Sequence, residues 1–313
     1  MAIRRIELEA PAPFRLDLCV WTLRRRAHNA VDRWDGTTYR RVVTTEDGPI
    51  ALAVRQESGP SGPLAVELCT PRRVPSDSSA IEARRLLERM LGLGVDLRDF
   101  YAFAERDHRL AALVRRFAGM RPPRFPSVFE ALVNAVACQQ LSLTVGIHLL
   151  NRLANRYGER AGGPGEHTAF PTPERLAAVD PDELRSLGFS HAKSRAITFL
   201  AQGASRGADF EGFAGLSDEG ARSTLMALPG IGRWSTEYTM LRGLGRLHVL
   251  PGDDVGARNN LHRRFGLVAA SYDDVAELSR SWWPYGGLVY FHLLLDALDD
   301  AGELCVTGGA AER

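Results

Sequence analysis

LPGIGRWSTEY, residues 228–238, is the stretch that decides the fold of this chain. Residues 217–227 before it carry helix formers with no proline, and the apolar and aromatic residues after it recur at helical spacing. Pro229 ends the first helix, and the glycines beside it allow turn conformations that are closed to residues with a Cβ. The sequence therefore predicts a helix, a tight hairpin at 228–233 and a second helix.

The hairpin is suited to contact an anion. Gly230 and Gly232 have no side chains, so the amide groups at the start of the second helix can come close to a ligand. A helix N-terminus favours negative charge, and a phosphate of a DNA backbone fits that description. The alternative is a buried pair of helices with an incidental turn.

A second motif follows the hairpin. Residues 250–254 read LPGDD, a proline and glycine loop that ends in an aspartate. The two motifs together resemble the helix-hairpin-helix of the base-excision DNA glycosylases, the HhH-GPD superfamily, and specifically its 3-methyladenine DNA glycosylase II branch. The resemblance covers roughly residues 120–300 and is strongest over 168–266.

The fold class predicted for the chain is α+β. Residues 1–115 read as an N-terminal α+β domain, because β-rich runs over 38–44, 50–55 and 64–70 alternate with turn signals. Two helical segments, over residues 14–26 and 79–91, are expected to cover one face of the strands. Arg24 to Arg26 are interpreted as a solvated helix end. Residues 116–313 read as helical, and the resemblance implies a glycosylase fold of two helical lobes.

A bend is predicted between two helices near residue 140. Ser127 and Glu130 form a capping box in which the glutamate reaches back, and the helix they open runs to Cys138. Ser142 is an N-cap for the next helix. Residues 139–141 between them are therefore expected to project their side chains.

The resemblance gives this bend a function. In the family, such a junction supplies the residue that fills the gap left by a flipped nucleotide. Gln140 is then the wedge, with Gln139 beside it and Leu141 as the alternative, since a wedge normally works by apolar insertion. The other interpretation is that the glutamines only solvate a helix end. Arg233 and Thr236, next to the hairpin glycines, complete the expected DNA contacts.

Asp254 is the expected catalytic residue. Breaking an N-glycosidic bond leaves a sugar with oxocarbenium character, which needs a fixed carboxylate near it and a water to attack. Asp254 opens the helix expected over residues 255–265, where the N-terminus favours the ionised form, while Asp253 supplies the ordinary cap. In one alternative the two aspartates have the opposite roles, with Asp253 catalytic and Asp254 as the cap. In another, both are helix caps only.

The resemblance also predicts how the sugar is attacked. Bifunctional members place a lysine shortly after the hairpin glycines to form a Schiff base and cut the strand. Trp234 stands at that position here, and the one lysine, Lys193, lies in an earlier helix, where an exposed or phosphate-facing side chain is expected. A monofunctional enzyme without lyase activity is therefore predicted.

Three aromatic residues are candidates for the base pocket. Trp234 and Tyr238 match pocket positions of the alkylation-repair branch, and Tyr285 offers a third wall. Alkylated purines carry positive charge and gain from stacking against electron-rich rings. The alternative is that Trp234 and Tyr238 belong to a core stripe.

Charge and cysteine content limit how the protein can bind DNA, metals and cofactors. The formal net charge of the 313 residues is +1, so DNA contacts must come from backbone amides and local arginines. The cysteines lie far apart and suggest neither zinc nor an iron–sulfur cluster, and no cofactor is expected beyond a monovalent cation considered at the hairpin. No apolar signal core or membrane span is seen, which predicts a cytoplasmic protein. We also expect it to be a monomer.

The resulting hypothesis is a DNA glycosylase that flips an alkylated purine out of double-stranded DNA and hydrolyses its N-glycosidic bond. Two alternatives stay open. One is a non-catalytic helix-hairpin-helix protein that binds bent or damaged duplex. The other is a glycosylase for oxidised or deaminated bases.

Overall fold

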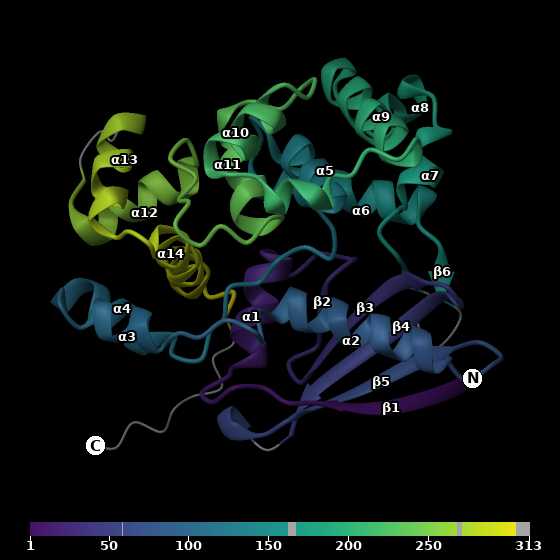
Figure 1. Cartoon of the computed structure of the whole chain (residues 1–313), viewed down its shortest axis with the longest axis horizontal. Helices are drawn as coiled ribbons and strands as arrows, with labels where there is room; N and C mark the ends of the chain where they lie inside the picture. Colours follow the sequence, from purple (N-terminus) through teal and green to yellow (C-terminus); the bar gives the residue numbers. More distant parts are fainter. Residues whose placement is uncertain (58, 162–166, 268–270, 305–313) are drawn as a thin grey trace.

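The computed structural model describes residues 1–57, 59–161, 167–267 and 271–304. It has the α+β architecture that the sequence predicts, with an antiparallel five-stranded sheet below a helical region (Figure 1). The strand order is β1-β5-β4-β3-β2. The strands of this sheet are β1 (Ala2–Leu8), β2 (Arg33–Trp34), β3 (Thr38–Thr45), β4 (Gly48–Gln56) and β5 (Leu64–Thr70).

The sheet buries one face under two helices. Along β5 the side chains of Leu64, Val66 and Leu68 are buried while those between them are half-buried, the alternation that a strand with one covered face produces. These side chains share a core with α1 (Leu16–Arg24) and α2 (Asp77–Leu91). The three predicted runs are strands, whereas β1 and the short β2 were not predicted.

The helices form two lobes, as the resemblance implies. The first lobe has its own apolar core and consists of α5 (Val128–Cys138), α6 (Leu143–Tyr157), α7 (Pro173–Ala177), α8 (Pro181–Ser186), α9 (His191–Ser205) and α10 (Asp218–Met226). The second lobe consists of α3 (Arg98–Ala104), α4 (His108–Arg116), α12 (Val255–Phe265), α13 (Tyr272–Ser281) and α14 (Gly286–Asp300). Between them runs α11 (Arg233–Arg242), with Met240 in the first core and Leu241 in the second.

The packing of α3 and α4 bears on the domain boundary. Phe100 of α3 and Leu110 of α4 belong to the same apolar core as α14, not to the core of the sheet. These helices are therefore part of the second lobe, although they precede the first lobe in the chain. We propose that the boundary between the two regions lies before Arg98 rather than at residue 115.

Glu130 joins the helical region to the sheet instead of completing a capping box. Ser127 caps α5 by accepting the Glu130 amide at 3.1 Å, as predicted. The Glu130 carboxylate, however, accepts two hydrogen bonds from Arg41 of β3, at 2.7 and 2.6 Å. Arg41 also donates to Asp32 at 2.6 Å, and Tyr39 donates to the same carboxylate at 2.7 Å. The expected return bond is absent because the buried guanidinium takes both carboxylate oxygens.

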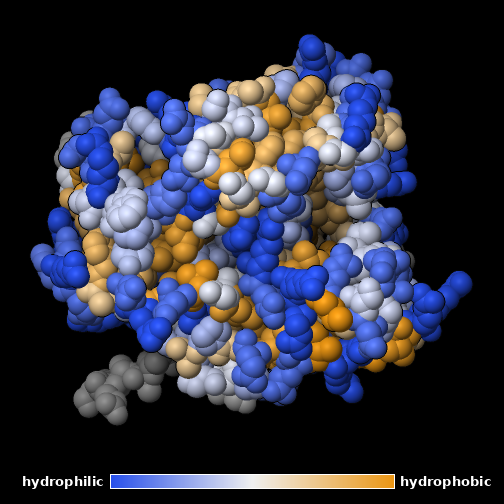
Figure 2. Space-filling model, viewed as in Figure 1, coloured by the Kyte–Doolittle hydropathy of each residue, from blue (hydrophilic) through white to orange (hydrophobic). Residues whose placement is uncertain are grey.

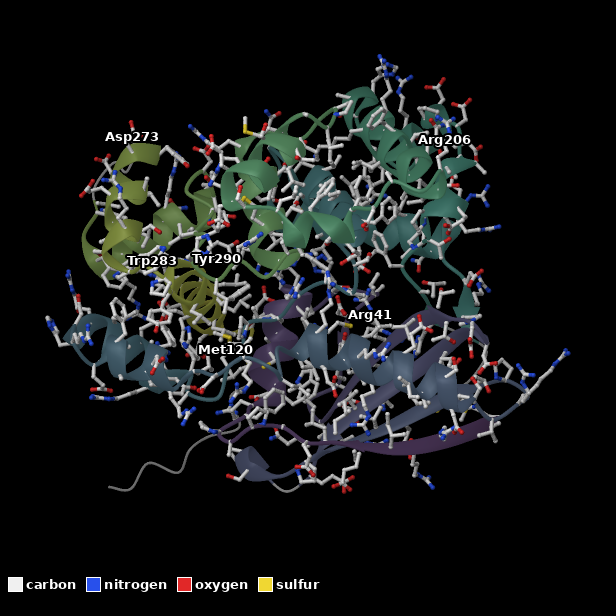
Figure 3. All side chains as sticks on the ribbon, viewed as in Figure 1. Arg41, Met120, Arg206, Asp273, Trp283 and Tyr290 are labelled. Atoms are coloured by element: carbon white, nitrogen blue, oxygen red, sulfur yellow. The ribbon has the colours of Figure 1, made fainter. Side chains whose placement is uncertain are left out.

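This polar network lies where the two regions meet. Figure 3 shows Arg41 between the sheet and the helices above it. On the face drawn in Figure 2, hydrophilic side chains cross the middle of the molecule between the two regions. The interface therefore combines apolar packing with buried ion pairs.

None of the helices in the described part of the chain has the length and apolar content that crossing a bilayer requires.

Candidate active site

A cleft of about 1180 Å³ lies between the two helical lobes. Five segments line it: the end of α1, the bend between α5 and α6, the hairpin with the start of α11, the loop that leads into α12, and α14. The hairpin, the bend and the aspartate loop were all predicted as functional, and the structure brings them to one cleft. The contribution of α1, which belongs to the N-terminal region, was not predicted.

The two hairpin glycines have different reasons to be glycine. Gly230 has a φ of +81°, and a Cβ there would lie 2.6 Å from the Cβ of Ala196 on α9. Gly232 has a φ of −100°, which any residue adopts, and a Cβ there would meet nothing within 4 Å. The expectation that both glycines take a conformation closed to other residues is therefore wrong for Gly232. Its role is to leave the N-terminus of α11 uncovered on the cleft side.

Arg233 and Thr236 differ in their access to a strand. Arg233 is exposed, lines the cleft, and is held by Asp253 at 2.5 Å and by the ring of Tyr272 at 3.7 Å. Thr236 is fully buried, and its amide donates to the Gly232 carbonyl within the helix. The Thr236 side chain is therefore covered on the core side of α11, which does not favour the expected contact with a strand. Arg233 is the stronger candidate of the two.

The bend between α5 and α6 presents two side chains. Gln140 is exposed with a φ of +53°, and Leu141 is 43% exposed. Gln139 instead faces the protein: its amide nitrogen donates to the Gly230 carbonyl at 2.7 Å and to the Ser235 hydroxyl at 2.6 Å. Gln139 therefore ties the bend to the hairpin, while the next two residues form the projecting tip.

Lys193 has a structural role that the sequence did not indicate. Its ammonium donates to the carbonyls of Ala137 and Gln139, at 2.9 and 2.7 Å, and so closes the end of α5. Burial lowers the pKa of Lys193 below its ordinary value. The expectation of an exposed or phosphate-facing lysine is wrong, because this side chain is committed to the bend.

The carboxylate of Asp254 faces the cleft while it caps α12. One oxygen accepts the Ala257 amide at 2.8 Å, the usual N-cap bond. The other accepts from the Trp234 indole and from the Tyr290 hydroxyl, both at 3.2 Å. Asp253 was expected to provide the cap, but it pairs with Arg233 and Arg258 instead.

Tyr290 is a site residue that sequence reasoning missed. It lies on α14, labelled in Figure 3, lines the cleft and donates to Asp254. Burial and the nearby Asp254 charge raise its pKa well above the ordinary 10, so its hydroxyl stays protonated and remains a donor. Its only sequence signal is a tyrosine within the mostly apolar run of residues 288–295.

The aromatic residues divide into cleft and core. Trp234 and Tyr238 stack with ring centroids 5.1 Å apart, and both belong to the cleft lining. Tyr238 is only 2% exposed, however, so it mainly supports Trp234. Tyr285 packs against the rings of Phe100 and Phe103, at 5.5 and 5.2 Å, outside the cleft lining. The prediction of Tyr285 as a pocket wall is therefore wrong, because its ring closes the core with α3.

Arg25 was predicted in a solvated helix end, and the structure buries it. It is 3% exposed, lines the cleft, and caps α1 with a φ of 60°. Its guanidinium donates to the Tyr238 hydroxyl and to the Asn134 side chain, both at 2.7 Å. The N-terminal region therefore reaches the aromatic pair of the cleft through one side chain.

Glu237 holds the loop that carries Asp254. It is 2% exposed on the far side of α11 and accepts the Gly252 amide at 3.0 Å and the Tyr272 hydroxyl at 2.6 Å. Glu237 thus holds the loop at Gly252, two residues before Asp254. Among the described residues no group of three or more His, Cys, Asp or Glu could hold a metal ion, and Cys305 lies outside them.

Comparison with known proteins agrees with this geometry. Residues 133–285 match the family described as HhH-GPD superfamily base excision DNA repair protein. The chain is 32% identical over 160 residues to DNA-3-methyladenine glycosylase 1 of Schizosaccharomyces pombe, covering 50% of this chain and 67% of the relative. The chain belongs to the HhH-GPD superfamily.

Two further proteins resemble the chain. DNA-3-methyladenine glycosylase 2 of Escherichia coli is 36% identical over 168 residues, which cover 53% of this chain and 58% of that protein. The solved 3-methyladenine DNA glycosylase of Archaeoglobus fulgidus superposes with a TM-score of 0.83 and 25% identity, over 96% of this chain and all of that one. The chain thus spans little more than half of the E. coli relative, while the archaeal fold matches nearly from end to end.

Proposed function

We propose that the protein is a monofunctional DNA glycosylase that removes an alkylated purine from double-stranded DNA by hydrolysis. The observation that carries the proposal is Asp254: its carboxylate faces an open cleft bounded by a hairpin with bare amides and by an exposed tip. The relatives named as 3-methyladenine glycosylases support the alkylated class of base.

Each part of the cleft has a role in this reaction. The uncovered start of α11 binds a phosphate through backbone amides, and Arg233 adds a charge at the same edge. The flipped base lies against Trp234. As the glycosidic bond breaks, its electron pair leaves with the base nitrogen, and the Asp254 carboxylate stabilises the positive charge on the sugar. Water supplies the hydroxyl group to the sugar, and its proton goes to solvent when the base was cationic or to the base when it was uncharged.

The position of the one lysine supports water as the nucleophile. Trp234 occupies the position where bifunctional relatives carry the Schiff-base lysine, and its indole is bonded to Asp254. Lys193 is the one lysine in the chain, and both of its bonds go to carbonyls at the end of α5. A Schiff base would require Lys193 to leave these partners, so we propose that the strand is left intact.

Duplexes that each carry one defined lesion test this function. We expect release of free alkylated base, with strand breaks only after alkali treatment. Breaks without alkali would overturn the water mechanism, and excision confined to oxidised or deaminated bases would overturn the alkylated class. Binding of damaged duplex with no base released would leave the non-catalytic alternative. The monomeric state, the cytoplasmic location and a monovalent cation at the hairpin stay predictions.

The tip of the bend provides a prediction about base flipping. We propose that Gln140 and Leu141 together fill the gap left by the flipped base, because both are exposed at the cleft edge. The double variant Gln140→Ala/Leu141→Ala is expected to lower excision from duplex by about tenfold or more, since unstacking a base costs a few kcal/mol. Excision of the same lesion from single-stranded DNA should change little.

Val145→Ala is the matched control for the tip. Val145 lies on the first turn of α6, and it is 43% exposed, as Leu141 is. Comparing Gln140→Ala and Leu141→Ala singly shows which side chain is the wedge. An effect of Val145→Ala as large as that of the double variant would contradict a specific role for the tip.

A further inference from the structure

The carboxylate of Asp254 accepts hydrogen bonds from three different helices. The Ala257 amide of α12 donates to one oxygen at 2.8 Å. The Trp234 indole of α11 and the Tyr290 hydroxyl of α14 both donate to the other oxygen, each at 3.2 Å. Donors from three separate elements therefore meet on one side chain that lines the cleft.

The helix-capping bond alone does not fix the orientation of this carboxylate. The last torsion of an aspartate side chain has a broad energy profile, so a bond to one oxygen leaves the other oxygen free to turn. Trp234 and Tyr290 restrain that second oxygen from outside α12. The plane of the carboxylate is therefore set by all three donors, and the loss of one of them loosens it.

Tyr290 is suited to restrain the carboxylate because its own ring is held in place. Its side chain is 7% exposed and belongs to the apolar core of the second lobe. A tyrosine hydroxyl has one proton to donate, and here that proton goes to Asp254. Since burial raises the pKa of Tyr290, the proton stays on the hydroxyl over the whole neutral range.

A donor has two opposite effects on a catalytic carboxylate. It withdraws part of the negative charge that the cationic sugar needs, and it holds the remaining charge in one place. If the Tyr290 hydroxyl is removed, a water molecule from the cleft can donate to the same oxygen, so the withdrawal of charge changes little. A mobile water does not restore the fixed orientation, and a small misplacement of a catalytic group can cost up to about 10²-fold in rate.

We propose that Tyr290 is a positioning residue, which holds the Asp254 carboxylate in the orientation that stabilises the cationic sugar. This inference rests on the proposed glycosylase function and extends the site beyond the hairpin and the aspartate loop. Tyr290 acts through Asp254, so its contribution depends on the charge of that side chain.

Tyr290→Phe tests this role, because it removes one oxygen and keeps the packed ring. Single-turnover release of an alkylated base should fall by about tenfold or more. A duplex with a pyrrolidine ring at the lesion position carries a protonated nitrogen in place of the cationic sugar, and it should bind the variant about tenfold more weakly. A duplex with an uncharged tetrahydrofuran at that position should bind within about twofold of the unaltered protein, because it has no charge for the carboxylate to stabilise.

A double-mutant cycle on the pyrrolidine duplex shows whether Tyr290 acts through the carboxylate. Asp254→Asn alone should weaken binding of this duplex, and adding Tyr290→Phe should weaken it no further, because no charge remains to be positioned. An equal loss from Tyr290→Phe in both backgrounds would overturn the proposal. Unaltered or faster base release by Tyr290→Phe would also overturn it.

Tyr285→Phe is the matched control. Tyr285 stands at the start of the same helix, and its ring packs against Phe100 and Phe103 outside the cleft lining. The control loses the same oxygen and should keep both base release and pyrrolidine binding within about twofold. Equal losses in the two variants would mean a general disturbance of α14 and would contradict the proposal. If the unaltered protein releases no alkylated base, the glycosylase function itself fails, which is a different outcome from normal release that Tyr290→Phe leaves unchanged.

Discussion

Asp254→Asn is expected to reduce base release by about 10²–10⁴-fold while DNA binding persists, because it removes the charge that the cationic sugar needs. The substitution is suited to this site because Asp254 has two tasks. Asparagine caps a helix about as well as aspartate does, so the bond from the Ala257 amide can be kept. The amide group then faces Trp234 and Tyr290 without negative charge.

The same variant separates catalysis from capping. If Asp254 were only the N-cap of α12, Asp254→Asn would leave both the melting temperature and the rate nearly unchanged. Catalysis is measured by single-turnover release of base, and binding by titration of a labelled lesion duplex. Unaltered folding together with a lost rate is the expected combination.

Asp253→Asn is the matched control for Asp254→Asn. Asp253 is the neighbouring carboxylate, and its bonds go to Arg233 and Arg258 at the surface. The Asp253 side chain is 25% exposed, and ion pairs near the surface contribute about 1 kcal/mol or less, so the rate should fall by no more than about fivefold. A large loss in Asp253→Asn with full activity in Asp254→Asn would show that the two aspartates have the reverse roles.

The predictable parts of this protein are those encoded by residues close together in sequence. The hairpin follows from one proline, two glycines and helical spacing, and the strands over 38–45, 48–56 and 64–70 follow from short β-rich runs. Asp254 follows from a loop that opens a helix. Such signals depend on local backbone preferences, which tertiary contacts rarely change for strong patterns.

The missed parts depend on contacts across the chain. Arg25 bonds a tyrosine 213 positions later, so nothing near it in sequence distinguishes it from a solvated helix end. Tyr285 was assigned to the cleft from the resemblance to the family, which does not show toward which side of the start of α14 its ring points. Glu130 fits a capping box locally, and a guanidinium 89 positions earlier takes its carboxylate instead.

Arg41→Met is expected to lower the free energy of unfolding by about 3–5 kcal/mol, the usual effect of removing one partner of a buried ion pair. Arg41, Asp32 and Glu130 are all at most 5% exposed. The variant leaves two buried carboxylates without their cation, at the place where the sheet meets α5. Urea denaturation at neutral pH measures the loss of stability. The loss should exceed that of Arg40→Met, because Arg40, the preceding residue of β3, pairs with Asp35 where both side chains are exposed.

The pH dependence of Arg41→Met shows whether charge causes the loss. Burial alone would raise the pKa of Asp32, but Arg41 and Tyr39 hold it below its ordinary 3.8. In the unaltered protein this group therefore adds stability above about pH 4, which is lost as the pH falls through the folded-state pKa. Without Arg41, burial raises the pKa of the carboxyl groups of Asp32 and Glu130. As the pH falls, these groups take up protons, and the cost of burying their charges in the variant disappears. The stability difference between the two proteins should thus narrow below about pH 5. A difference that is constant with pH would mean that lost packing of the arginine stem, rather than unpaired charge, destabilises the variant.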